Sequence, residues 1–163
     1  MRLSSIHIPV QIFPDLQALD PEDARLLEAA RKATRHAYAP YSKFRVGAAL
    51  RLSDGSIISG SNQENASFPA GICAERVALS AASAVSPGLA VTALALTYIN
   101  ELAASSRPIS PCGICRQTLA EYELRFEQPI RLILGGATGE IFIFNQATDL
   151  LPLAFNSQEL KAN

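Results

Sequence analysis

The 163-residue sequence is short of several residue types, and each shortage excludes a class of protein. It contains three cysteines, an odd number that fits reduced thiols in the cytoplasm better than a disulfide framework. Fourteen Lys and Arg residues against fifteen Asp and Glu leave a formal net charge of −1. Such a balance lacks the basic excess that binds a nucleic-acid backbone or an anionic membrane.

Long apolar runs are also missing from the sequence. No stretch approaches the roughly 18–20 apolar residues that a membrane-spanning helix needs. The first residues, "MRLSSIHIPVQIF", lack the unbroken apolar segment and the small-residue cleavage site of a signal peptide. A hydrophobic content of 48% with 18% charged residues favours one globular domain with a sizeable core. We therefore expect a cytoplasmic protein that binds neither membrane nor nucleic acid.

The hydrophobic pattern predicts an α/β fold. A strand-like arm over 1–19 alternates apolar residues, but Pro9 restricts it to a sheet edge or a free arm. A single domain over 20–163 follows, and its first helix is capped by Asp20 and stopped by Pro40. The further predicted elements are strands at 44–52 and 56–61, a helix at 73–86, a buried strand at 91–99, a helix at 112–126, and strands at 130–134 and 140–144.

The last two predicted strands are joined by only five residues, "GGATG". Because a parallel crossover needs a dozen or more residues, these two strands must be antiparallel. The pattern therefore predicts one mixed sheet of five strands with helices packed on it.

All three cysteines stand at the predicted starts of helices: Cys73 in "CAE", and Cys112 and Cys115 in "PCGICRQ". A lone free cysteine is more often a small buried hydrophobe, but a helix N-terminus lowers the thiol pKa and favours the metal-binding thiolate. Cys112 and Cys115 also face the same side of their helix. Three thiolates that converge from two helix ends predict a zinc site.

A closed structural zinc site needs a fourth protein ligand, and this chain has no fourth cysteine. Its two histidines, His7 and His36, lie in the arm and near the end of the first helix, away from the cysteines. An open fourth position with water is the arrangement of catalytic zinc. It is favoured here over a closed site and over a redox pair of Cys112 with Cys115.

Glu75 lies two residues after Cys73, in the first turn of the same predicted helix. An isolated Glu there is ordinarily a favourable acid at the positive end of the helix dipole. Beside a zinc ligand it becomes the candidate general base. Zinc deaminases combine a metal-activated water, a non-ligand Glu and a "P-C-x-x-C" element in this way.

With "CAER" and "PCGICRQ" in place, the chain resembles the cytidine deaminases of the three-cysteine zinc class. The resemblance covers residues 21–155 and includes "YAPYSKFRVGAAL" at 38–50, "SDGSIISGSNQENASFPAGICAER" at 53–76 and "LLPLAF" at 150–155. It implies a three-layer α/β/α fold and one Zn²⁺ per chain, bound by Cys73, Cys112 and Cys115. The implied activity is hydrolysis of a C–N bond that converts cytidine and deoxycytidine to uridine and deoxyuridine plus ammonia, a step of pyrimidine salvage.

The resemblance also implies a role for each further residue of the site. Glu75 protonates N3 while the activated water attacks C4, and ammonia then leaves. The implied substrate contacts are Phe44 at the base, backbone atoms of Ala74 at its amide edge, and Asn62 and Glu64 at the ribose hydroxyls. Phe68 stands where relatives have Tyr, so a hydroxyl contact is lost.

Arg76 is a candidate to offset the excess negative charge of the predicted zinc site. Three thiolates more than cancel the charge of Zn²⁺, which weakens its effect on the pKa of the water. An Arg next to Glu75 that hydrogen-bonds one of the thiolates would withdraw part of that negative charge.

By the same resemblance the protein is a homotetramer with shared active sites, in which Phe155 and Phe68 reach into neighbouring subunits. The tail supports this implication, because exposed apolar patches often mark interfaces and the tail carries Leu150, Leu151, Leu153 and Phe155. The alternative is that the tail folds back onto its own sheet.

Three other functions compete with cytidine deamination. Polynucleotide deaminases typically have His in place of Cys73 and run their last two strands parallel, which the "GGATG" connection forbids. Deaminases of nucleoside analogues such as blasticidin S share the motifs and stay open. A non-catalytic zinc-binding module would bind zinc but release no ammonia from cytidine.

Overall fold

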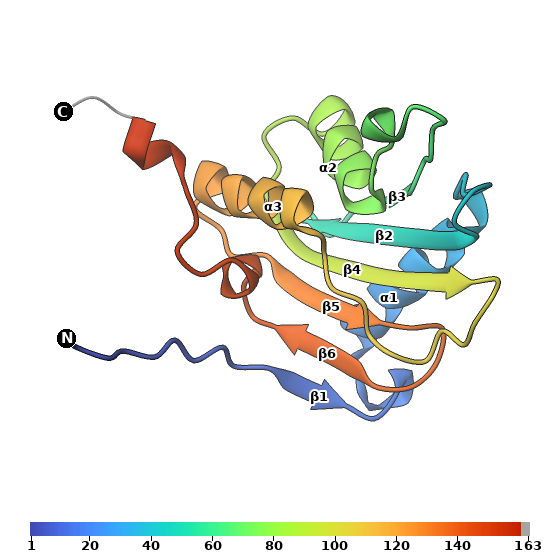
Figure 1. Cartoon of the computed structure of the whole chain (residues 1–163), viewed down its shortest axis with the longest axis horizontal. Helices are drawn as coiled ribbons and strands as arrows, with labels where there is room; N and C mark the ends of the chain where they lie inside the picture. The colour runs from blue at the N-terminus through green and yellow to red at the C-terminus, as the bar shows by residue number, and fades with distance from the viewer. Residues whose placement is uncertain (161–163) are drawn as a thin grey trace.

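The computed structural model describes residues 1–160 and shows a six-stranded sheet with helices on both faces (Figure 1). The strands are β1 (Gln11–Phe13), β2 (Phe44–Leu52), β3 (Ile57–Ser61), β4 (Val91–Asn100), β5 (Arg131–Gly135) and β6 (Ile141–Phe144). The helices are α1 (Pro21–Ala33), α2 (Ala74–Val85) and α3 (Gly113–Phe126), with short 3₁₀ turns η1 (Leu16–Ala18), η2 (Thr34–His36), η3 (Phe68–Ala70), η4 (Ala147–Leu150) and η5 (Ser157–Leu160). The last three residues of the predicted domain lie outside the described part of the chain. No helix within 1–160 is long and apolar enough to span a membrane.

The strand order is β1-β6-β5-β4-β2-β3, and β4 with β5 is the one parallel pair in this sheet of the described chain. The other neighbours are antiparallel, and they include β5 and β6, as their short connection predicts. Helix α3 lies in the crossover between the two parallel strands, which is the connection such a pair needs.

The predicted count of five strands is wrong, because the N-terminal arm adds a sixth at the sheet edge, which is one of the two placements predicted for it. β1 pairs antiparallel with β6 at the sheet edge, with Gln11 opposite Ile143. Pairing begins only after Pro9, and residues 1–10 run out beyond the sheet without regular secondary structure (Figure 1). The partner strand lies near the other end of the chain, so local alternation could not reveal the pair.

Strand β4 separates the two hydrophobic cores of the fold. Its alternate side chains point to opposite faces, so Leu94 and Leu96 join the core under α2 and α3, whereas Ala93 and Ala95 join the core under α1. This two-sided burial explains the nearly continuous apolar sequence of the strand. The helices therefore cover both faces, as an α/β/α sandwich requires (Figure 1).

Helix α1 begins where the sequence predicts and ends earlier than predicted. Asp20 Oδ1 accepts hydrogen bonds of 3.1 and 2.9 Å from the backbone N–H groups of the second and third helical residues. The α-helix ends at Ala33, well before Pro40, because the chain tightens into η2 from Thr34 onward. The loop that follows η2 can then cross the end of the sheet toward the catalytic cavity described below.

Candidate active site

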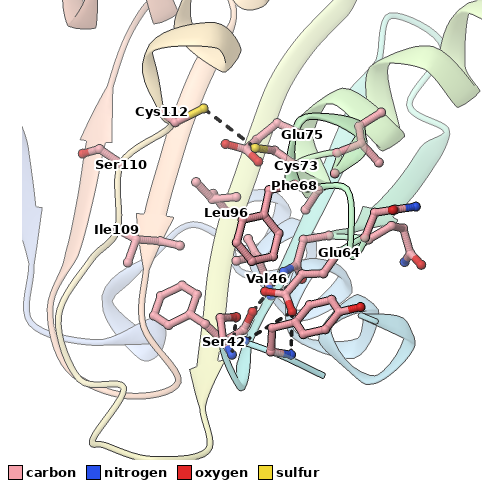
Figure 2. Close-up of a pocket in the computed structure, with 18 residues that line it drawn as sticks. Ser42, Val46, Glu64, Phe68, Cys73, Glu75, Leu96, Ile109, Ser110 and Cys112 are labelled. Atoms are coloured by element: carbon pink, nitrogen blue, oxygen red, sulfur yellow. Dashed lines mark hydrogen bonds between the residues drawn. The ribbon is translucent and has the colours of Figure 1, made fainter. Parts of the chain in front are cut away.

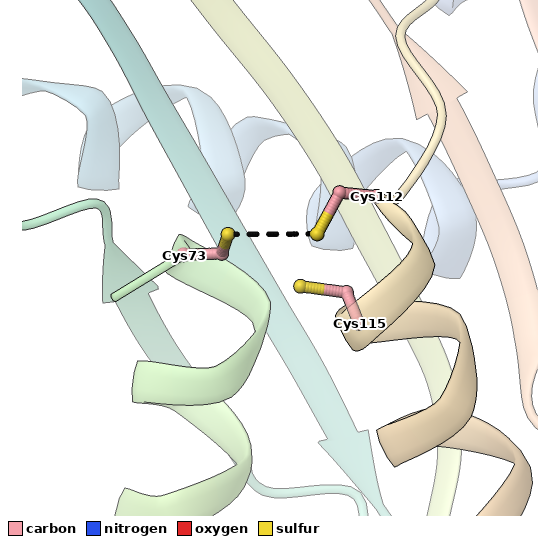
Figure 3. Close-up of side chains that lie close together, drawn as sticks. All are labelled: Cys73, Cys112 and Cys115. Carbon is pink, nitrogen blue, oxygen red and sulfur yellow. Dashed lines mark hydrogen bonds between the residues drawn. The ribbon is translucent and has the colours of Figure 1, made fainter. Parts of the chain in front are cut away.

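The three cysteines lie together where α2 and α3 begin (Figure 3). Cys73 is the N-cap of α2, Cys112 is the N-cap of α3, and Cys115 lies in the first turn of α3. Their Sγ atoms all lie within 4.8 Å of one another, and those of Cys73 and Cys112 are 3.8 Å apart, so the thiols are free. Cys115 is buried, whereas Cys112 is exposed to solvent.

The sulfur positions fit a zinc ion. In tetrahedral coordination with Zn–S bonds of about 2.3 Å, neighbouring sulfurs are about 3.8 Å apart. In the described part of the chain the cluster contains no His, Asp or Glu, and both His7 and His36 are exposed elsewhere. The protein therefore offers a metal three thiolates and leaves a fourth position open.

Hydrogen bonds among the thiols lower the pKa of Cys73 and raise the pKa of Cys115. The pKa of Cys73 is lowered to about 6, first by a hydrogen bond from Cys115, then by one from Cys112 and by the charge of Arg76, against the opposing effect of burial. The pKa of Cys115 is raised, because its proton makes the bond to Cys73 and because the group is buried. The metal-free site thus holds a thiolate near neutral pH, which is the form that a metal binds.

Glu75 lies in the first turn of α2, and its side chain lies beside Cys73 in the pocket (Figure 2). Only 4% of the residue is exposed. Burial raises the pKa of Glu75, and the negative charge of Cys73 raises it further. A carboxyl in this setting keeps its proton to a higher pH than usual, which suits a group that takes up and releases protons near neutrality.

The thiols and Glu75 lie at one end of a cavity of about 790 Å³ (Figure 2). None of its lining residues is Lys or Arg, and its two acids are Glu64 and Glu75. Its wall contains two of the predicted zinc ligands together with the predicted base and substrate contacts, namely Phe44, Asn62, Glu64, Phe68, Ala74 and Glu75. The structure therefore brings most of the predicted site into one cavity.

Glu64 is fixed at the far end of this cavity by backbone N–H groups. Its Oε2 accepts hydrogen bonds from Tyr41 N at 2.9 Å and from Ser42 N at 3.3 Å. Hydrogen bonding, first with Ser42, keeps the pKa of Glu64 below its ordinary value, so the side chain is ionised. Both backbone hydrogen bonds go to Oε2, so the carboxylate is held in place with its charge facing the cavity.

Asn62 is fixed by the neighbouring strand β2. Its Nδ2 donates to Phe44 O at 3.0 Å, and its Oδ1 accepts from Val46 N at 2.8 Å. These two bonds use half of the hydrogen-bonding capacity of the Asn62 amide and leave one N–H and one lone pair for a ligand. The strand that carries Phe44 thus also sets the orientation of Asn62.

Phe44 is supported from behind by Tyr98. Their rings are stacked, with centroids 4.6 Å apart and an interplanar angle of 16°. Sequence reasoning gave no role to Tyr98, Tyr41 or Ser42. Tyr41 and Ser42 belong to the "YAPYS" stretch just before Phe44, so that motif could have indicated them, whereas Tyr98 lies in an apolar strand with no such signal.

Arg76 lies differently from the expectation, and Phe68 lines the cavity of its own chain. Arg76 forms no hydrogen bond with a thiolate in the described part of the chain; it acts on Cys73 through its charge. The ring of Phe68 lies at the cavity of its own chain, edge-on to Tyr41 at a centroid distance of 6.0 Å (Figure 2). The residue is 76% exposed, and its contact with a neighbouring subunit stays a prediction. The η3 turn that carries Phe68 leads directly into Cys73 and so keeps the ring near the site.

The C-terminal tail is divided between packed and exposed residues. Leu150 packs against the core, and its carbonyl accepts a 2.9 Å hydrogen bond from Arg116. Leu153 is 94% exposed, and Phe155 is 59% exposed and lies outside the wall of the cavity. Beyond Leu150 the tail stays attached to its own chain through a 2.9 Å hydrogen bond from Gln117 of α3 to Phe155 O, but the side chains of Leu153 and Phe155 remain exposed.

Known proteins resemble this chain in both sequence and structure. Residues 20–126 match the cytidine and deoxycytidylate deaminase zinc-binding region. The cytidine deaminase of Halalkalibacterium halodurans is 41% identical over 136 residues, which span 83% of this chain and 95% of that protein. The crystal structure of cytidine deaminase from Burkholderia pseudomallei has a TM-score of 0.69 and 40% identity, over 80% of this chain and 97% of that one. A blasticidin-S deaminase from Bacillus cereus is 34% identical over a shorter stretch of 108 residues, 64% of this chain and 75% of that protein.

The matched region contains all three cysteines and Glu75. The thiol geometry alone fits a tetrahedral metal, and the zinc-binding region to which these residues belong specifies zinc as that metal. On the fold, the site and these similarities together, the chain belongs to the zinc-dependent cytidine and deoxycytidylate deaminase family.

Proposed function

We propose that this protein hydrolyses cytidine to uridine and ammonia in the cytoplasm, as a step of pyrimidine salvage. The observation that carries the proposal is the position of buried Glu75 beside Cys73, at the three-thiol cluster and inside a large cavity. A carboxyl that moves protons next to a metal-activated water is the chemistry that displaces the amino group of a cytosine ring.

When bound, zinc lowers the pKa of water and so supplies a nucleophile at neutral pH. Glu75 takes one proton from the water and delivers it to N3 of the ring, while the oxygen adds to C4. Glu75 then carries the second proton of the water to the amino group, which leaves as ammonia. Cytidine and water thus become uridine and ammonia, and Glu75 returns to its starting state.

The cavity favours a nucleoside over a nucleotide. Ionised Glu64 and the amide of Asn62, which keeps one N–H and one lone pair unused by the protein, are suited to sugar hydroxyls. A phosphate group at the same end of the cavity would face the negative charge of Glu64, and no Lys or Arg lines the cavity; the nearby charge of Lys43 already acts on Glu64. We infer that cytidine and deoxycytidine are both substrates and that deoxycytidylate is not, with Phe44 against the base and the backbone of Ala74 at its amide edge.

Assembly into a homotetramer with shared active sites is part of the proposal. The exposure of Leu153 and Phe155, just beyond the packed part of the tail, supports it, because such side chains gain most by contact with another chain. In this arrangement Phe155 completes the cavity of a neighbouring subunit. Arg76 offsets part of the thiolate charge. The catalytic domain spans residues 20–163, and the arm over 1–19 adds β1 to the edge of its sheet.

An ultraviolet assay over a panel of substrates tests the function. Cytidine and deoxycytidine should be deaminated, whereas cytosine, cytidine monophosphate and deoxycytidylate should not. Blasticidin S belongs in the panel, because turnover of that compound but not of cytidine would assign the protein to analogue resistance. Protein that holds zinc yet releases no ammonia from any member of the panel would be a non-catalytic zinc-binding module.

A further inference from the structure

A second cavity, of about 230 Å³, shares no lining residue with the catalytic cavity, although its Tyr98 stacks on Phe44 of that cavity. The end of α1 with η2, the end of β4 and the loop after β5 enclose it. Its lining includes Arg31, Lys32 and Arg35 and contains no acid. Within residues 1–160 none of these three cations forms an ion pair, whereas other arginines of the chain do.

Arg31 carries the group that most needs a ligand. Its Nε is the one buried side-chain nitrogen or oxygen in the described chain that has no hydrogen-bond partner. Its Nη2 donates to Gly136 O at 3.3 Å, and Thr97 Oγ1 donates to the same oxygen at 3.0 Å. Because a carbonyl oxygen has two lone pairs, Gly136 O is filled and cannot accept from Nε as well. Leaving such a buried donor unpaired is costly, so an acceptor from outside the chain is favoured.

The helix dipole explains only part of this cluster. Cations near the C-terminus of a helix are favourable, which accounts for the exposed Lys32 and Arg35 taken singly. The dipole gives no acceptor to the buried N–H of Arg31, and three like charges around one small cavity repel each other. A bound anion would remove the repulsion and supply the acceptor together.

We propose that this cavity binds a phosphate group, either as inorganic phosphate or as part of a monophosphate ester. The guanidinium of Arg31 turns toward the cavity so that Nε–H donates to a phosphate oxygen, and Lys32 and Arg35 supply the remaining charge. A dianion matches three unpaired cations better than a carboxylate does. The site is separate from the catalytic cavity, whose wall has no cation.

Equilibrium dialysis of the zinc-loaded enzyme with radiolabelled phosphate tests the site, at constant ionic strength in chloride. We expect one phosphate per chain, and at least tenfold weaker binding in Arg31→Gln and in Arg35→Gln. Arg35 is exposed, so its variant keeps the test valid if Arg31→Gln folds poorly. Arg25→Gln is the matched control: it removes the same charge from an exposed position of α1 outside the cavity and should bind as wild type does.

Competition experiments identify the site and the source of the phosphate group. Excess cytidine should not displace phosphate, and uridine monophosphate should compete with it if the site accepts esters; competition by inorganic phosphate alone assigns the site to the free ion. Absence of saturable binding overturns the proposal. So does an equal loss in Arg25→Gln, which indicates unspecific attraction, or displacement by cytidine, which places the phosphate in the catalytic cavity.

Discussion

Glu75→Gln keeps the size and polarity of a side chain that is only 4% exposed, but it removes the ability to carry a proton. Loss of one general acid–base group typically lowers the rate by about 10²–10⁴-fold. In the proposed reaction one carboxyl serves the water, N3 and the amino group in turn, so we expect a loss of about 10⁴-fold in kcat, or about 5.4 kcal/mol of barrier. The three sulfurs are untouched, so zinc should remain bound at one ion per chain.

The same substitution should change the pH dependence of stability in metal-free protein. Burial raises the pKa of Glu75 in the folded chain, so its ionisation is less favourable there than in the unfolded chain. As pH rises from the unfolded-state pKa through the raised folded-state pKa, the wild-type protein should lose stability relative to Glu75→Gln. Above that range the difference is constant, and below both pKa values it is smallest because both side chains are neutral.

Three measurements check this reasoning on the same preparations. Turnover is followed by the ultraviolet absorbance of cytidine, bound zinc by elemental analysis, and stability by urea unfolding of chelator-treated protein over a pH series. Glu75→Asp is the matched control, since it keeps the acid and shortens the side chain by one methylene; it should lose less activity than Glu75→Gln. A Gln variant that keeps zinc and turns over within a few-fold of wild type would place the proton transfer on another residue. A stability difference that does not vary with pH would refute the raised pKa.

Three further perturbations test the metal site and the assembly. Cys112→Ser should reduce zinc below one ion per chain by elemental analysis, because only two thiolates remain; full zinc content would mean that Cys112 is not a ligand. Arg76→Ala should raise the pKa of Cys73 above about 6 in metal-free protein, because the positive charge that favours the thiolate is gone; a titration of thiolate absorbance with an unchanged midpoint would contradict this. Deleting residues 152–163 should abolish turnover while zinc stays bound, and mixing these chains with Glu75→Gln chains should restore some activity in hybrid tetramers; an active truncated monomer by light scattering would end the proposal of shared sites.

The sequence predicted those parts of the fold that depend on residues close together in the chain. Asp20 caps α1 because its side chain reaches two N–H groups of the same helical turn. β5 and β6 are antiparallel because their short connection permits nothing else. β4 can be buried on both faces because none of its side chains is charged, and its apolar run predicted that burial.

The features that the sequence left open or missed depend on contacts between distant segments. β1 is a strand only because Gln11 and its neighbours meet β6. The loop after η2 is held by tertiary hydrogen bonds, in which Tyr38 N donates to Asn62 O at 3.0 Å and Glu64 N donates to Tyr38 O at 2.8 Å. The backbone N–H of Tyr41 is thereby brought to Glu64, a relation that neither segment shows alone.

The convergence of the three thiols follows from strand direction, which no local motif encodes. β3 and β4 both run antiparallel to β2, so they point the same way. α2 follows β3 and α3 follows β4, and both helices pack on the same face of the sheet (Figure 1). The N-caps of two separate helices, Cys73 and Cys112, therefore meet at 3.8 Å. A metal bound between them would join α2 to α3. Glu75 lies beside this site, in the first turn of α2 and in the wall of the cavity, so the same arrangement of helices also positions the base.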